Sequence, residues 1–80
     1  MPTVFRSGGF RVFFFANEGR PREPPHVHVE QGDQEAELWL RPDVSVAYND
    51  GFNARDLNRL VRMIEANRER IERYWNEFFS

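Results

Sequence analysis

A helical pattern runs through residues 51–79, GFNARDLNRLVRMIEANRERIERYWNEFF, near the C-terminal end of the chain. Asn53 is a favourable N-cap, and Asp56 three residues later places a negative charge at the positive end of the helix dipole. The apolar residues that follow recur every three or four positions, which is the period of a helix with one buried face. They are Leu57, Leu60, Val61, Ile64, Ile71, Trp75 and Phe78. The pattern predicts one long C-terminal helix from Ala54 to about Phe78.

Short apolar stretches separated by turn signals precede this helix. Glycine, proline and aspartate mark the turns, and the stretches between them predict strands. The predicted strands are residues 4–6, 10–16, 26–31, 35–40 and 44–48, with a proline-containing loop at residues 17–25. Val44, Val46 and Tyr48 are expected to face the core. Strands followed by a helix predict an α+β fold, in which a small antiparallel sheet of four to five strands is packed by the long C-terminal helix.

The chain of 80 residues is expected to form a single domain, residues 1–80. It contains no Cys, which excludes a disulfide and a thiolate zinc site. No apolar run approaches the ~20 residues of a membrane span, and Met1-Pro2-Thr3 does not begin a signal peptide. We therefore expect a cytoplasmic protein without membrane contact. A formal net charge of −2 does not by itself indicate nucleic acid as a partner.

Aromatic residues are abundant, with eight Phe, two Trp and two Tyr. One helix and a short sheet do not easily hide this much aromatic surface, so we expect a second buried surface, in a homodimer or with another protein. The predicted interface residues lie on the outer sheet face and on a helix end that overhangs the sheet. They are Phe13, Phe15, Trp39, Tyr74, Trp75, Phe78 and Phe79. The alternative is that these side chains belong to the core, through a one-residue change of strand register or a covering segment.

His26 and His28 are the only histidines, and they occupy alternate positions of a predicted strand. Their imidazoles therefore share one face with Glu30, opposite the valines of the same strand and away from the core. One hypothesis is a divalent metal site formed by both histidines with a carboxylate, either Glu30 or Glu37. A second is a catalytic acid and base pair. The third is that the histidines are hydrogen-bonded residues of a surface or an interface.

A basic stripe lies along the first half of the predicted helix. Arg55, Arg59 and Arg62 are spaced at i, i+4 and i+7, and with Arg11 they are candidates for binding the phosphates of a nucleic acid. Charges of both signs follow along the helix, which is more typical of a solvated face. Nucleic acid is therefore a possible but not a favoured partner. Combined with the histidine pair, the stripe gives a ribonuclease-like toxin as an alternative hypothesis.

Four motifs in this order resemble one known family. They are MPTVFR at residues 1–6, PPHVHV at residues 24–29, AYN and GFN at residues 47–49 and 51–53, and WNEFF at residues 75–79. Together they resemble a small bacterial and archaeal domain of unknown function, the family catalogued as number forty-one-sixty. The Pro-Pro-His-x-His motif of the family corresponds to residues 24–28. Many members carry a further His or acidic residue upstream, where this chain has Asn-Glu-Gly-Arg at residues 17–20.

The resemblance implies no established activity. Genes of the family often lie beside a second short gene, in the layout of toxin–antitoxin pairs, which implies a protein partner encoded by that neighbouring gene. The main functional hypothesis from sequence is therefore a protein-interaction module of a toxin–antitoxin-type pair. A ribonuclease-like toxin and a metal-binding protein are the alternatives, and the missing upstream histidine weakens a site made of three histidines.

Overall fold

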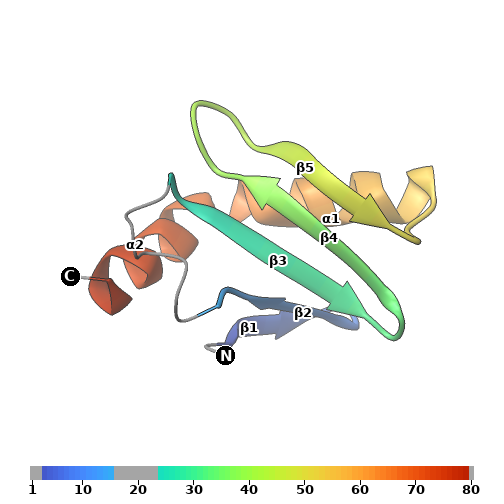
Figure 1. Ribbon diagram of the computed structural model, residues 1–80, viewed down its shortest axis with the longest axis horizontal. Coiled ribbons are helices and arrows are strands. Elements are labelled where there is room, and N and C mark those ends of the chain that lie inside the picture. Colours follow the sequence, from blue (N-terminus) through green and yellow to red (C-terminus); the bar gives the residue numbers. More distant parts are fainter. Residues whose placement is uncertain (1–2, 16–23, 80) are drawn as a thin grey trace.

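The computed structural model describes residues 3–15 and 24–79, which form a five-stranded antiparallel sheet with two helices on one face (Figure 1). The strands are β1 (Thr3–Ser7), β2 (Phe10–Phe13), β3 (His26–Gln31), β4 (Gln34–Trp39) and β5 (Ser45–Asp50), and the helices are α1 (Ala54–Ala66) and α2 (Arg68–Phe78). The order in the sheet is β1-β2-β3-β4-β5, so every strand pairs with its neighbour in sequence. The α+β prediction is confirmed. Residue 16 of the second predicted strand and residues 17–23 of the predicted loop lie outside the described residues.

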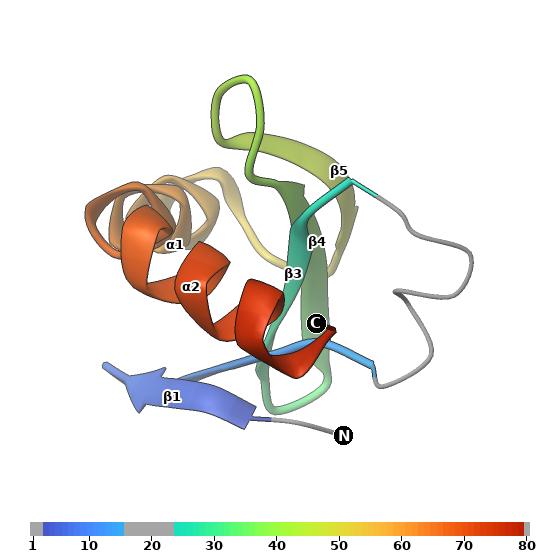
Figure 2. The same ribbon diagram turned by 90° about the vertical axis from the view of Figure 1, so that its left-hand side faces the viewer.

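The core lies between the helices and the inner face of the sheet, and both helices stand on the same side of the strands (Figure 2). Val27 and Val29 of β3 are fully buried there, in one cluster with Leu60 and Ile64 of α1 and with Ile71 of α2. Because side chains alternate along a strand, the residues between these valines project from the opposite side, which we call the open face. The open face comprises Thr3, Arg6, Arg11, Phe13, His26, His28, Glu30, Glu35, Glu37, Trp39, Ser45, Tyr48 and Asp50, together with Phe15 just beyond β2, whose ring contacts His28.

The C-terminal segment is two helices, where the sequence predicted one. The N-cap at Asn53 is as predicted, because its side chain accepts a hydrogen bond from the N–H of Asp56 at 2.8 Å. The break occurs at Asn67, whose φ of −114° and ψ of 12° are not helical, and whose side chain donates to the carbonyl of Met63 at 2.8 Å. After this break α2 runs in a new direction (Figure 2). The predicted overhang is therefore wrong for Trp75, which is only 1% exposed.

The edge strand β5 is exposed along its whole length. The prediction that Val44, Val46 and Tyr48 face the core holds for Val44, which packs against the core just before β5, and is wrong for Tyr48. A bulge at Glu37/Leu38 pairs Tyr48 with Glu37 but Val46 with Leu38. Val46 therefore lies on the helix side and Tyr48 on the open face, and they are 40% and 55% exposed. Among the described residues, no helix is both long and apolar enough to cross a membrane.

Candidate metal centre

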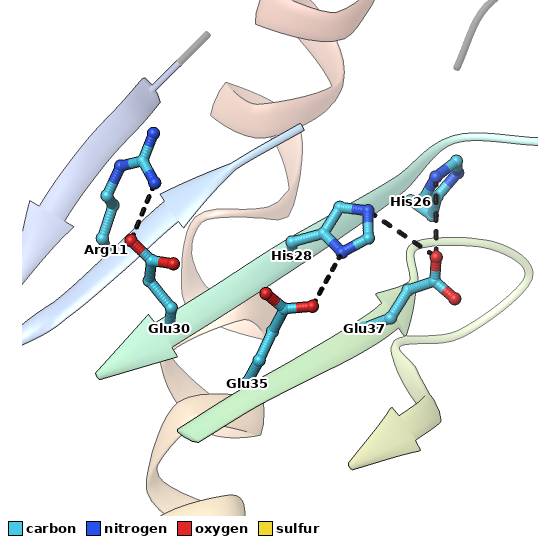
Figure 3. A network of polar contacts seen from close by, with 6 residues as sticks. All are labelled: Arg11, His26, His28, Glu30, Glu35 and Glu37. Atoms are coloured by element: carbon cyan, nitrogen blue, oxygen red, sulfur yellow. Dashed lines mark hydrogen bonds and ion pairs between the residues drawn. The ribbon is translucent and has the colours of Figure 1, made fainter. Parts of the chain in front are cut away.

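Three potential metal ligands converge on the open face of the sheet. His26 and His28 project from β3, and Glu37 projects from the position of β4 that pairs with His28 (Figure 3). Glu37 Oε2 lies 3.8 Å from Nε2 of His26 and 3.7 Å from Nε2 of His28. One nitrogen or oxygen atom from each of the three residues lies within 4.8 Å of the others. Two imidazoles and one carboxylate thus point at a common position, which we call the His–Glu cluster.

In each imidazole Nε2 points toward Glu37, and the other nitrogen, Nδ1, faces a different acceptor. His26 Nδ1 is 3.0 Å from the carbonyl oxygen of Pro24. A carbonyl can only accept a hydrogen bond, so Nδ1 carries the proton in neutral His26 and Nε2 keeps a lone pair toward Glu37. Nδ1 of His28 lies 4.0 Å from Oε2 of Glu35, and its Nε2 also faces Glu37 (Figure 3). The contact to Glu35 is longer than a hydrogen bond, whereas the Pro24 carbonyl fixes the ring of His26 in the way typical of histidines that ligate metals.

Aromatic rings cover both imidazoles. The sequence predicted that the histidines face away from the core, and it did not predict that they are buried. Phe13 stacks on His28 with ring centroids 5.3 Å apart, and Phe15 meets the same ring edge-on at 4.8 Å. Trp39 and Trp75 lie 5.5 and 5.2 Å from His26. As a result His26 is 1% and His28 is 7% exposed. This shell limits the access of water to the two imidazoles, whereas the side chain of Glu37 remains 29% exposed.

Glu30, the carboxylate predicted first as a metal ligand, does not belong to the His–Glu cluster. It lies opposite Arg11 and accepts a hydrogen bond from the guanidinium at 2.8 Å. Arg11 also donates to the hydroxyl of Thr3 at 3.0 Å and stacks 4.3 Å above the ring of Phe13. Arg11 is therefore engaged within the sheet, where the sequence proposed a phosphate ligand. Glu37, the other carboxylate named from sequence, occupies the place predicted for Glu30.

The three arginines of the helix stripe are on the other side of the sheet from the histidines. Arg55 and Arg62 are exposed on α1, which covers the inner face. Arg59 bonds to Asp56 at 3.3 Å and lies 5.6 Å from the centroid of Phe10, a core residue. None of the three can therefore contact a phosphate held at the His–Glu cluster. Of the four arginines predicted to bind phosphate, Arg11 alone shares a face with the histidines, and it is already paired with Glu30.

The predicted interface aromatics divide into buried and exposed groups. Phe13 and Trp75 are 1% exposed, so the prediction that they lie on a surface is wrong for these two. Phe15, Trp39 and Phe79 are half-buried. Tyr74 and Phe78 are 40% and 45% exposed. The buried ring of Phe14 lies 5.3 to 6.0 Å from the rings of Tyr74, Trp75, Phe78 and Phe79. Sequence reasoning missed Phe14 as the centre of this aromatic group.

Comparison with family models gives one match, described as "Domain of unknown function (DUF4160)", over residues 9–76. The matched range contains all three residues of the His–Glu cluster. Comparisons with curated proteins and with solved structures found no match.

Proposed function

This chain belongs to the family of domains of unknown function DUF4160, and from the side chains of its open face we propose that it binds a divalent transition-metal ion. The convergence of His26, His28 and Glu37 is the observation that supports the proposal. Two imidazoles with one carboxylate form a ligand set used for zinc and for non-haem iron. The ligand set combines the histidine pair of the family motif with a carboxylate from the next strand.

The spacing of the ligand atoms suits a metal ion. Two ligands of a tetrahedral ion with bonds of about 2.1 Å are about 3.4 Å apart. The distances from Glu37 to the two imidazoles, 3.8 and 3.7 Å, need only a small contraction to match. Three protein ligands leave a coordination position for water or a small molecule, as in catalytic rather than structural zinc sites.

The charges of the open face favour a cation over a phosphate. Glu35 and Glu37 flank the histidines, and Glu30 and Asp50 lie on the same face. Among the residues that the structure describes, Arg11 contacts one of these carboxylates and is already paired with it, since its guanidinium binds Glu30. A phosphodiester substrate would meet repulsion there, whereas a divalent cation gains favourable Coulomb energy. The ribonuclease-like alternative is therefore less well supported than metal binding.

The test is calorimetric titration of chelator-treated protein with Zn²⁺, Ni²⁺, Co²⁺, Mn²⁺ and Fe²⁺. We expect one ion per chain for at least one of these metals. Glu37→Gln should weaken binding by more than about tenfold, the smallest loss typical for residues that only orient ligands. Glu30→Gln is the matched control and should leave the affinity unchanged. The proposal fails if no metal binds, or if the two substitutions have equal effects.

A protein-interaction module of a toxin–antitoxin-type pair is the second candidate function. It is supported by the exposed rings of Tyr74 and Phe78 on α2, which sit next to the buried Phe14. Exposed aromatic patches of this kind are more typical of interfaces than of free surface. Co-expression with the product of the neighbouring gene tests it. The two proteins should co-purify, and the double substitution of Tyr74 and Phe78 by Ser should separate them, whereas Tyr48→Ser should not.

A further inference from the structure

A row of charged side chains crosses the open face from one edge of the sheet to the other. The strand register pairs Arg6 with Arg11, Arg11 with Glu30, Glu30 with Glu35, and Glu35 with Asp50. Directly paired residues of antiparallel strands project from the same face. The row therefore has two arginines at the β1 side and three carboxylates toward the β5 side. We call these five residues the charge row.

The charge row is poorly balanced within one chain. Like charges directly opposite each other destabilise a sheet, and three of the four neighbouring pairs in the row are like-charged. The Arg11–Glu30 ion pair at 2.8 Å is the one favourable pair. Arg6 and Asp50, at the two ends, are exposed, and neither has an ion-pair partner within residues 3–15 and 24–79. A surface with the opposite order of charges would relieve the repulsion.

We infer that a second copy of this chain packs on the open face, related to the first by a two-fold axis parallel to β3. Rotation about such an axis reverses the strand order and keeps the position along the strands. β1 of each copy then lies over β5 of the other, and four of the five residues of the charge row meet an opposite charge. Arg6 faces Asp50 of the second copy, and Arg11 faces Glu35 of the second copy. Glu30, on the axis, faces Glu30 of the second copy and keeps Arg11 of its own chain as its ion-pair partner.

The distances and the remaining side chains suit this arrangement. Sheets pack face to face about 10 Å apart, a gap that an arginine and a carboxylate bridge from opposite sides. Between the charge row and the far end of the sheet, the open face presents Tyr48, which is 55% exposed, and the half-buried Trp39 and Phe15. A second copy would bury these rings at the centre of the interface, with the exposed ends of the charge row at its rim.

Charge reversal at the two ends of the row tests the inference. The mass of the wild-type particle, measured by light scattering in chelator, should be that of a dimer, so that the result does not depend on the proposed metal. Arg6→Glu places a carboxylate against Asp50 of the second copy, and Asp50→Arg places two arginines together. Each variant alone should raise the dimer dissociation constant by at least about tenfold. Both positions are exposed, so circular dichroism should show an unchanged fold.

Mixing the two variants gives the decisive result. A heterodimer of Arg6→Glu with Asp50→Arg has opposite charges at both contacts, and we expect the mixture to dimerise as the wild type does. Arg62→Glu and Glu65→Arg on α1 are the matched controls and should leave the wild-type dimer intact. A wild-type monomer at millimolar concentration overturns the inference. So does a dimer that survives both reversals, that the controls disrupt equally, or that mixing does not restore.

Discussion

Burial of two imidazoles in a small sheet costs free energy unless their nitrogen atoms have polar partners. His26 meets this requirement at Nδ1 through the carbonyl of Pro24, and its Nε2 lone pair, 3.8 Å from Glu37, is the one that the proposed metal would occupy. The sequence correctly placed His26 and His28 on one face, because side chains two residues apart in a strand project from the same side. Their burial could not be predicted, because it depends on rings from other parts of the chain, Phe13 and Phe15 over His28 and Trp39 and Trp75 beside His26, whose placement is not a local property. For the same reason the sequence could not show which carboxylate, Glu30 or Glu37, lies beside the two imidazoles.

Because Trp75 is buried within one chain, we expect its substitution to change the stability of the fold and not the state of assembly. Its ring is 1% exposed and packs 5.3 Å from Phe14 and 5.2 Å from His26. Trp75→Ala should lower the free energy of unfolding by about 3–5 kcal/mol, as truncations of buried aromatic residues do. Urea denaturation measures this loss, and light scattering should show an unchanged particle mass.

Phe78→Ala is the comparison for Trp75→Ala, because the ring of Phe78 belongs to the same aromatic group but is 45% exposed. It should cost clearly less than Trp75→Ala. Equal losses for the two variants, or dissociation of the particle by Trp75→Ala, would show that the end of α2 is not part of the core of a single chain.

At the scale of elements, the start of α1 is the feature that sequence predicted best. A cap is a local signal, since Asn53 accepts from an N–H three residues away at 2.8 Å. Asn53→Ala should lower the free energy of unfolding by about 1 kcal/mol in thermal or urea denaturation. Asn58→Ala, at an exposed position inside the same helix, should be neutral or slightly stabilising because Ala is the better helix former. A loss from Asn58→Ala as large as that from Asn53→Ala would contradict a capping role.

The break between α1 and α2 and the bulge in β5 were not predicted, and both depend on long-range contacts. Asn67 does interrupt the apolar stripe, but a single polar residue is equally compatible with a continuous helix. Because of the break, α2 places the ring of Trp75 in contact with the rings of Phe14 and His26. The alternation in residues 44–48 was visible, but a bulge moves Val46 and Tyr48 to opposite faces, and bulges leave little trace in sequence.

For the whole molecule, the proposed metal should act as a stabilising ligand. A domain of this size buries only about 60% of its unfolded surface, so its stability margin is small. A metal at 100 times its dissociation constant should raise the free energy of unfolding by about 2.7 kcal/mol, since it binds the folded chain preferentially. Thermal denaturation with and without metal measures this gain.

The carboxylate variants separate specific from general effects of the metal on stability. Glu30→Gln should keep the metal-dependent gain, and Glu37→Gln should lose it. A gain that persists in Glu37→Gln would mean that the ion acts elsewhere on the acidic surface, and the proposed ligand set would then be wrong.

The neighbour-to-neighbour strand order also has a kinetic consequence. Each pairing in the β1-β2-β3-β4-β5 sheet joins segments close in sequence, so relative contact order is low for a sheet protein. Such chains fold faster than sandwiches with distant pairings, and single-exponential refolding is the expected behaviour. The longest connection between paired strands spans residues 14–25. Lengthening it with glycine should slow refolding only modestly, because loop-closure entropy grows with the logarithm of loop length.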